Sequence, residues 1–314
     1  MKKLVLKITI YVFLVLLVLE CIIRICHLTK DYPVRIIDEF GVEKWKPNQK
    51  GFSVTGNRRQ NFSEFRINRS GFNSYREFEP SQDKKEIALV GDSFIEGFHQ
   101  DFNNSIGKKI ENVLTDYEVY EYGYAGYDLA DQLNLIHQYN EDFKLIDYVF
   151  IGLDFNTDLK RGQHKIIQDR MRLESPMYRN LRKIKLLTYM NSIGVIDAVK
   201  KRVINLISFK SKVKKEVSNM KEKDLTNEMN QEYLINFKAL LKTYNFDKER
   251  YIFFIEKSRT PQKFIDYLNS NKFQFIDLST HLMQSKQPTT LIYDKHWNDK
   301  GRSLVANSIL NYFQ

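Results

Sequence analysis

The sequence predicts an α/β fold in which five parallel strands form a sheet covered by helices on both faces. Short, strongly apolar segments alternate with segments of helical periodicity, first over residues 85–158 and again over residues 250–313. Apolar segments of this kind are typical of strands that are buried on both faces. The first two end directly at a glycine, Gly91 and Gly123. Functional residues of such sheets gather at the carboxyl ends of the strands.

The individual elements follow from these patterns. The apolar runs predict strands over residues 85–90, 118–122, 146–153, 251–255 and 273–278. Helical periodicity predicts helices over residues 106–114, 128–139 and 299–313. Residues 30–80 mix aromatic residues, prolines and glycines, and we expect them to form an irregular lead-in.

The N-terminal segment predicts a membrane-spanning helix. Residues 4–25 are almost wholly apolar and follow Lys2 and Lys3. At about 1.5 Å per residue, such a helix can cross a hydrocarbon core of about 30 Å. Glu20 and Arg24, four residues apart, could pair near one interface. A cleavable signal peptide is the alternative, but no small-x-small cleavage site follows the apolar run. The basic N-terminus favours a cytoplasmic start and an extracytoplasmic remainder.

A basic insertion separates the third and fourth strands. The stretch between Lys160 and Lys223 holds 18 Lys/Arg but five Asp/Glu, so it accounts for the whole net charge of +10. It is predicted to be mainly helical, for example over residues 179–187 and 196–206. A solvated helical cap is one interpretation, and a basic surface for anionic glycan or lipid headgroups is the other. The charge is confined to the insertion, so we expect no nucleic-acid partner.

The chain therefore divides into a membrane anchor over residues 1–29, a lead-in over residues 30–84 and an α/β domain over residues 85–314. The basic helical insertion occupies about residues 160–245 of that domain. Cys21 and Cys26 lie in or beside the apolar segment, and the remainder of the chain contains no cysteine for a disulfide framework or a cysteine metal site.

The first candidate site residue is Ser93. An apolar strand runs into Gly91-Asp92-Ser93 and then into a helix, which places the serine where backbone N–H groups can stabilise an oxyanion. The pattern is not the Gly-x-Ser-x-Gly elbow of α/β-hydrolases. Taken alone, Gly-Asp-Ser is also compatible with an ordinary turn in which Asp92 or Ser93 caps the helix.

The second signal is the segment Asp294-Lys295-His296-Trp297-Asn298. A serine nucleophile needs a base, and the base needs a carboxylate that orients it. Of the six histidines, only His296 has an aspartate two residues before it in a loop that precedes a helix. Without the serine motif, it would be interpreted as an exposed loop histidine.

Two further segments follow strands and are plain turns by default. Glycines in Gly123-Tyr124-Ala125-Gly126 would let the backbone approach a substrate carbonyl. In the segment from Gly152 to Asp158, the Asn156 amide could donate to an oxyanion.

Together, these four segments resemble the SGNH/GDSL hydrolase superfamily. The resemblance covers about residues 66–158 and 250–313 and leaves the basic insertion unmatched. Residues 65–72 (FRINRSGF) are similar to the lead-in of membrane-anchored bacterial members. The Asp-Lys-His-Trp-Asn segment is similar to the form found in polysaccharide O-acetyl esterases and acetyltransferases. The resemblance implies a flavodoxin-like three-layer sandwich with no metal or organic cofactor.

The resemblance also implies the roles of the site residues. Ser93 and His296 would be catalytic, with Asp294 orienting His296. The oxyanion hole would use the Ser93 N–H, Gly126 and Asn156. The third block departs from the family pattern, in which Asn directly precedes Asp. Here Thr157 precedes Asp158, so whether Asn156 or Thr157 fills the role stays open.

The resulting hypothesis is a serine-dependent ester hydrolase or O-acyltransferase that acts on acyl, foremost acetyl, groups of an extracytoplasmic polysaccharide. Its expected partners are the acylated polysaccharide, the membrane and envelope polysaccharide machinery. Hydrolase and transferase share the acyl-enzyme and differ in whether water or a sugar reaches it. A non-catalytic glycan-binding or envelope-assembly protein on the same fold is the alternative.

Overall fold

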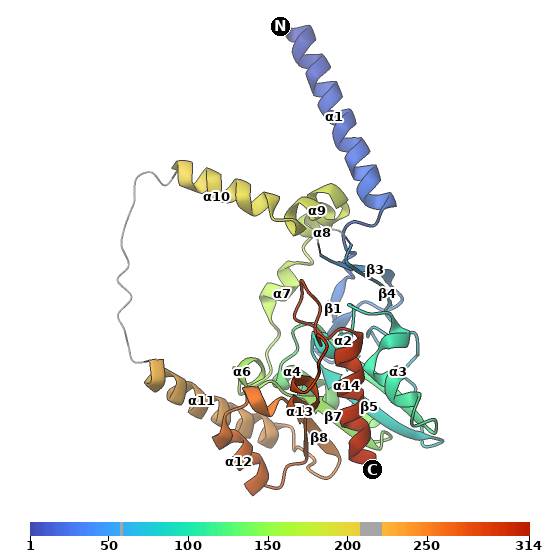
Figure 1. Cartoon of the computed structure of the whole chain (residues 1–314), viewed down its shortest axis with the longest axis vertical. Coiled ribbons are helices and arrows are strands. Elements are labelled where there is room, and N and C mark those ends of the chain that lie inside the picture. The colour runs from blue at the N-terminus through green and yellow to red at the C-terminus, as the bar shows by residue number, and fades with distance from the viewer. Residues whose placement is uncertain (57–58, 208–221) are drawn as a thin grey trace.

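Five parallel strands form the central sheet of the computed structural model, which describes residues 1–56, 59–207 and 222–314 (Figure 1). The strands are β5 (Lys85–Gly91), β6 (Tyr117–Gly123), β7 (Tyr148–Gly152), β8 (Tyr251–Ile255) and β9 (Phe275–Asp277). Their order across the sheet is β6-β5-β7-β8-β9, and neighbouring strands are parallel. This is the 2-1-3-4-5 order of flavodoxin-like folds, so the predicted α/β architecture is confirmed.

Helices cover both faces of this sheet because successive strand residues point to opposite sides. Ile87 and Leu89 of β5 belong to one apolar cluster, together with side chains of α3 (Ile106–Glu111) and α14 (Asp299–Leu310). Ala88 and Val90 of the same strand belong to a second cluster on the other face. That cluster is completed by side chains of three helices: α4 (Leu129–Gln138), α11 (Glu222–Thr243) and α12 (Gln262–Ser270).

Several predicted elements are shorter in the structure. The helix expected over residues 106–114 ends at Glu111, and the one expected over 299–313 gives way to a 3-10 turn, η3 (Asn311–Phe313). The remaining short elements are η1 (Phe102–Asn104), α5 (Asn140–Phe143), α6 (Phe155–Asp158), η2 (Lys257–Arg259) and α13 (Ser279–Met283). Element ends depend on caps and side-chain contacts that local periodicity does not encode.

The lead-in is more regular than expected. It contains two antiparallel pairs: β1 (Arg35–Ile37) with β2 (Glu43–Trp45), and β3 (Lys50–Thr55) with β4 (Asn61–Arg66). The β4 strand supports the loop after α2 (Ser93–Glu96), because the Ser63 hydroxyl donates to the Phe98 carbonyl at 2.5 Å. The side-chain amide of Asn61 donates to the His99 carbonyl at 2.6 Å. These contacts with distant residues stabilise the strands of the lead-in, which its mixed composition does not predict.

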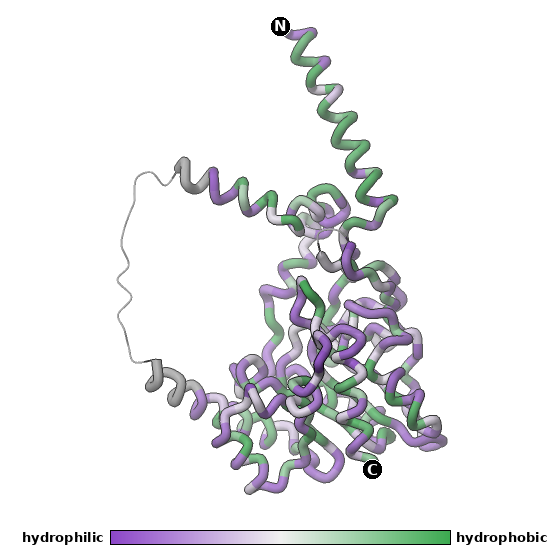
Figure 2. Tube along the Cα trace, viewed as in Figure 1, coloured by the Kyte–Doolittle hydropathy of each residue, from purple (hydrophilic) through white to green (hydrophobic). Residues whose placement is uncertain are grey.

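Helix α1 (Lys2–Ile25) projects from the body of the molecule, and its surface is apolar along most of its length (Figures 1 and 2). Among the described residues it is the one helix that is long and apolar enough to cross a membrane, and a signal sequence would pass the same test. The expected pair between Glu20 and Arg24 is present, with 2.5 Å between Oε1 and Nη2.

The insertion begins with four helices: α7 (Gln168–Arg172), α8 (Pro176–Lys183), α9 (Lys185–Ser192) and α10 (Val195–Ile207). The part of the predicted basic insertion over residues 208–221 lies outside the described residues. The helix expected over 179–187 is interrupted at Ile184, because a residue distant in the sequence, Glu20, binds the backbone there. The Glu20 carboxylate of α1 accepts hydrogen bonds from the Lys185 N–H at 3.0 Å and the Leu186 N–H at 2.6 Å, so α9 begins there.

The C-terminal part of α11 belongs to the core of the α/β domain. Phe237 is fully buried and contacts Phe253 of β8 and Phe264 of α12. Two residues earlier on the same helix, the Ile235 side chain is 64% exposed. The basic insertion therefore returns to the sheet through a helix that packs as a regular layer of the sandwich.

This packing gives a stability prediction. Phe237→Ala should lower the free energy of unfolding by about 3–5 kcal/mol, because it removes a large side chain from a site with no solvent access. The matched control Ile235→Ala should change it by less than about 0.5 kcal/mol. Urea unfolding of the detergent-solubilised full chain, followed by circular dichroism, measures both. Equal effects of the two substitutions would contradict the position of α11 in the core.

Candidate active site

Ser93 is the first residue of α2 and lies at the carboxyl end of the central strand β5. The preceding Asp92 caps this helix, and its carboxylate accepts from the Phe94 N–H at 2.9 Å. Gly91 permits the tight turn, since a Cβ atom there would lie 2.5 Å from Cγ1 of Ile95. The Ser93 N–H has no hydrogen-bond partner among the described residues. The serine thus stands at a helix start with a free donor beside it.

The α2 helix is pressed against the end of the neighbouring strand β6. A Cβ atom on Gly123 would lie 2.0 Å from the backbone nitrogen of Glu96, so only glycine fits. The buried Glu96 carboxylate then holds the next turn, because its Oε1 accepts from the Ala125 N–H at 3.0 Å. The same oxygen accepts from the Trp45 indole at 2.7 Å. These contacts fix the glycine-containing turn beside the serine.

Ser93, His296 and Asp294 come together as the sequence predicts. The Nε2 atom of His296 lies 2.7 Å from Oγ of Ser93. The Nδ1 atom of the same ring contacts Oδ1 of Asp294, which also accepts from the His296 N–H at 3.1 Å. The serine therefore has a base within hydrogen-bond reach, and a carboxylate orients that base. Ser93 begins α2, and His296 lies in a loop 203 residues later in the chain.

The loop that carries His296 is anchored on both sides. Leu291 N–H donates to the His296 carbonyl at 2.9 Å, and the Trp297 side chain packs in the core beneath. The next residue, Asn298, caps α14 and accepts from the Gly301 N–H at 2.9 Å. The ring of Phe94 contacts the rings of His296 and Trp297, each with 4.7 Å between ring centroids. The Asp-x-His-Trp-Asn segment thus forms one structural unit.

A second histidine, His99, completes the cluster and was not singled out by the sequence. Its Nε2 atom lies 3.1 Å from Oδ2 of Asp294, the oxygen that His296 leaves free. Its ring stacks on the His296 ring, with 3.9 Å between centroids and 18° between planes. Asp294 therefore lies between two imidazoles. The only local signal was a histidine shortly after the serine motif.

Charge states in this cluster follow from its environment. Burial and the neighbouring His296 lower the pKa of His99 to about 4, so His99 is neutral near pH 7. Burial opposes ionisation of Asp294, but hydrogen bonds from the His296 ring and N–H outweigh it and hold the pKa of Asp294 below its usual value. A neutral His99 with its proton on Nε2 donates to the Asp294 carboxylate. Its Nδ1 atom is buried without a partner among the described residues.

Among the described residues, His99, Asp294 and His296 form a group that could hold a metal ion, since their ligand atoms lie within 4.8 Å of one another. In the observed arrangement, however, each ring has a hydrogen-bond partner in the cluster: His296 contacts Ser93 and Asp294, and His99 contacts Asp294. The cluster is therefore organised for proton transfer from the serine hydroxyl.

The predicted oxyanion-hole residues have different outcomes. Gly126 adopts a φ of +93° in the turn that Glu96 fixes, and its carbonyl accepts from Arg170 at 2.6 Å. Asn156 does not line the cavity described below, and its exposed side-chain amide donates to the Arg259 carbonyl at 3.1 Å. Asp154 and Thr157 of the same block line the cavity beside Ser93 instead. Asp154 pairs with Arg259 at 3.0 Å.

A cavity of about 540 Å³ opens beside the serine and the histidine. Its walls include the neighbours of both residues, namely Asp92, Phe94, Lys295 and Trp297. Apolar side chains form much of the remaining wall, and polar ones lie among them: Gln132, Asp154, Asp158, Glu256 and Arg259. Burial raises the pKa of Asp158 well above its ordinary value. A small ester with polar substituents is compatible with such a cavity.

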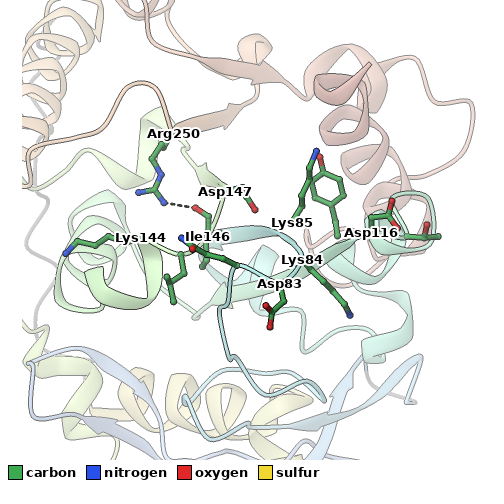
Figure 3. A pocket seen from close by; sticks show the side chains of 12 residues that line it. Asp83, Lys84, Lys85, Asp116, Lys144, Ile146, Asp147 and Arg250 are labelled. Carbon is green, nitrogen blue, oxygen red and sulfur yellow. Dashed lines mark hydrogen bonds between the residues drawn. The ribbon is translucent and has the colours of Figure 1, made fainter.

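A larger cavity, of about 870 Å³, lies at the amino ends of the strands, at the opposite end of the sheet from Ser93 (Figure 3). Its lining includes Lys85, Ile146 and Asp147, at or just before the starts of β5 and β7, and Arg250, whose guanidinium donates to the Ile146 carbonyl at 2.6 Å. The serine and histidine lie at the carboxyl ends of the strands. The position of this larger cavity therefore separates it from the cluster, and the site follows the rule for open α/β sheets.

Neither a scan against protein-family models nor a search of curated proteins gives a match. Solved structures with a similar fold include a lipolytic protein of the G-D-S-L family from Veillonella parvula, at 14% identity and a TM-score of 0.35, covering 73% of this chain and 98% of that one. A lipase/acylhydrolase from Enterococcus faecalis shares 12% identity with a TM-score of 0.38, covering 73% and 95%. A psychrotrophic esterase from Pseudoalteromonas sp. shares 10% identity with a TM-score of 0.39, covering 73% and 96%. Similarity at this level assigns no activity or substrate.

The buried Glu96 predicts a pH dependence of stability. Burial raises its pKa from 4.5 to about 7, so the folded chain holds this proton more tightly than the unfolded chain. The contribution of Glu96 to stability is therefore complete below pH 4.5 and falls as the pH rises through 7, by on the order of 3 kcal/mol in total. Glu96→Gln keeps the accepting Oε1 atom and should flatten this part of the profile. Urea unfolding between pH 4 and 8 measures it; an unchanged slope in the variant would contradict the assignment.

His99 predicts a selective kinetic effect. If it positions Asp294, His99→Ala should lower kcat of the esterase activity proposed below by about tenfold or more, the usual effect of losing a hydrogen bond to a charged group, and leave KM nearly unchanged. His99→Gln keeps an N–H donor near the Nε2 position and should recover part of the rate. Steady-state ester hydrolysis with a thermal-unfolding control separates this from a loss of folding. A change in KM alone would argue against a positioning role.

Proposed function

We propose that this chain is a serine-dependent esterase or O-acyltransferase of the SGNH/GDSL type, with Ser93 as nucleophile, His296 as general base and Asp294 as the carboxylate that orients it. The observation that carries the proposal is the 2.7 Å contact between Ser93 Oγ and His296 Nε2, with Asp294 on the other ring nitrogen. Nucleophile, base and orienting group are recognised by this geometry and not by their positions in the chain.

The reaction follows from the contacts. As Ser93 Oγ attacks the ester carbonyl, its proton passes to Nε2 of His296, and Asp294 stabilises the imidazolium that forms. The tetrahedral intermediate collapses as His296 returns the proton to the departing alcohol oxygen, which leaves an acyl group on Ser93. Water, or a sugar hydroxyl, then loses a proton to His296 and attacks this acyl-enzyme. The final collapse returns a proton to Ser93 and releases the acid or the new ester.

Two backbone donors support the oxyanion in this proposal. The Ser93 N–H lies beside the nucleophile and has no partner among the described residues. The N–H of Gly126 is the second candidate, in the turn held by Glu96. We do not include Asn156 as a third donor, because its side chain is exposed and one N–H of its amide already donates to the Arg259 carbonyl. Losing one donor typically costs about a hundredfold or more in rate, so we expect a slow or specialised enzyme.

The substrate and location are also part of the proposal. The resemblance of Asp294–Asn298 to polysaccharide-modifying relatives supports an O-acyl group, foremost acetyl, on a polysaccharide. The apolar surface of α1 supports anchoring by a single helix, and the basic N-terminus supports an extracytoplasmic domain. Envelope polysaccharide machinery is the corresponding partner.

A second candidate function has its own observation. The third block lines the cavity beside Ser93 with Asp154, Thr157 and Asp158 and with no side-chain amide, so an oxyanion there would lack that donor. A non-catalytic protein that binds glycan through this cavity is the alternative. It predicts glycan affinity that is insensitive to Ser93→Ala and no covalent labelling of the serine.

The test uses the full chain in detergent micelles, with a fluorophosphonate probe and 4-nitrophenyl acetate. Ser93→Ala should abolish labelling, and His296→Ala should lower both labelling and turnover by at least about a thousandfold. Ser192→Ala and His137→Ala, at exposed positions remote from the cluster in sequence, are the matched controls. A folded wild-type chain that is not labelled would favour the binding function. Labelling that survives Ser93→Ala would identify a different nucleophile.

Hydrolase and transferase are separated in a second arm. With an acetylated donor, acetate release is measured with and without an added unacetylated glycan. Transfer of acetyl to the glycan at the expense of acetate assigns an acyltransferase. Acetate release that the glycan leaves unchanged assigns a hydrolase.

A further inference from the structure

We propose that helices α8, α9 and α10 form a platform that lies on the surface of an anionic lipid membrane, at the level where α1 leaves it. This inference rests on the proposed membrane anchoring by α1 and goes beyond it, because it assigns a lipid-binding role to the insertion and an orientation to the whole domain. The occupant we commit to is the headgroup layer of the bilayer in which α1 is embedded.

The platform is attached directly to the end of the anchor. The Glu20 carboxylate of α1 binds the first N–H groups of α9, and the Arg24 guanidinium donates to the Lys183 carbonyl at the end of α8, at 2.5 Å. After α1 ends, Asp31 pairs with the Lys185 ammonium at 2.5 Å. Because these contacts join α1 to both helices, the position of α1 in a bilayer determines where the platform lies.

The α8 helix exposes the apolar face that a helix of a soluble domain would bury. Met177, Leu181 and Ile184 follow one another at spacings of four and three residues, so they lie on one side of α8 and its C-cap. Their exposures are 63%, 40% and 49%. Contiguous exposed apolar side chains mark a surface that contacts another molecule or a membrane. No described part of the chain covers this one.

Positive charge accompanies this apolar face. Arg179 and Lys183 are exposed on α8, and α10 exposes Lys200, Lys201 and Arg202 beside the 54% exposed Val199. Figure 1 shows α10 extending away from α9, to one side of α1 and near the level of the C-terminal end of α1. Apolar side chains flanked by Lys and Arg are the composition of helices that lie in the plane of a membrane interface. Each basic residue near an anionic surface adds to the electrostatic attraction.

Two features favour lipid over other occupants. The surface continues from the exit point of the one helix that could cross a membrane, so a bilayer around α1 is already next to it. The surface also combines apolar and basic side chains, whereas a polyanionic glycan would need only the charge. A second copy of the chain is the remaining possibility, and the experiment below distinguishes it.

The experiment places an environment-sensitive fluorophore at single cysteines in the full chain, reconstituted at one copy per nanodisc. Cys21→Ala and Cys26→Ala remove the native thiols. Met177→Cys and Leu181→Cys report on the platform, and Ile235→Cys is the matched control, since Ile235 is 64% exposed on the distant α11. Nanodiscs of phosphatidylcholine with phosphatidylglycerol contain lipids that carry a quencher near the headgroup.

We expect the probes at positions 177 and 181 to be quenched at least twofold more than the probe at 235. Replacing Lys200, Lys201 and Arg202 together by glutamate should reduce that difference in anionic nanodiscs and leave it unchanged in pure phosphatidylcholine. Equal quenching of all three probes in retained, folded chains would overturn the inference. A change in the fluorescence of the probes at positions 177 and 181 that appears only when two copies share a nanodisc would also overturn the inference, in favour of contact with a second copy.

The proposed function and this inference fail separately. Fluorophosphonate labelling of Ser93 is measured in the same nanodiscs, and its absence, together with selective quenching, would reject the esterase proposal while supporting the platform. A chain that is washed from the nanodiscs by alkaline carbonate would reject the anchoring by α1 and, with it, the platform.

Discussion

The close approach of α2 to the end of β6 is the constraint on which the site depends. Gly123 has no side chain, and this absence lets the backbone of Glu96 pass where a Cβ atom would lie at 2.0 Å. That contact sets the direction in which α2 leaves β5 and hence the position of Ser93 at its first residue. Glu96 then ties the following turn and the indole of Trp45 to the same point. One glycine thereby positions Ser93, the proposed nucleophile, together with a candidate oxyanion turn and part of the lead-in.

The second half of the site is built from a loop that is held at several points and leaves its carboxylate little freedom. Asp294 accepts from His296 through one oxygen and from His99 through the other. Because both oxygens accept hydrogen bonds, the Asp294 carboxylate stays ionised and keeps its orientation. A histidine that accepts a proton needs such a carboxylate to stabilise the imidazolium that forms. Stacking of a neutral His99 on His296 also limits the rotation of the His296 ring. His99 thus extends the serine, histidine and aspartate of the sequence motif by one residue.

Much of this could be predicted from the sequence, because the signals are local. Buried strands of a parallel sheet appear as apolar runs, and the residues after them meet at the carboxyl ends of the strands, which predicts the place of Ser93. His296 is predicted from the aspartate two residues before it, in the loop that precedes the last helix. What could not be predicted depends on contacts between distant segments. The break between α8 and α9 arises because Glu20, 165 residues earlier, caps Lys185. The residue type of Asn156 predicts an oxyanion donor, and the sequence gives no sign of the hydrogen bond that its amide makes to the distant Arg259 carbonyl.

The same long-range contacts connect the site to the anchor. In the segment after α1, the Asp31 carboxylate accepts from the Phe52 N–H of β3 at 2.9 Å. The partner strand β4 holds the loop of His99 through Asn61. Tyr32, also in the segment after α1, lies under the Arg182 guanidinium of α8, with 4.7 Å to the ring centroid. The serine, the insertion and the end of α1 are therefore parts of one contact network rather than separate modules joined by a linker. If α1 spans a bilayer, as proposed, that network would fix the height of Ser93 above the membrane surface.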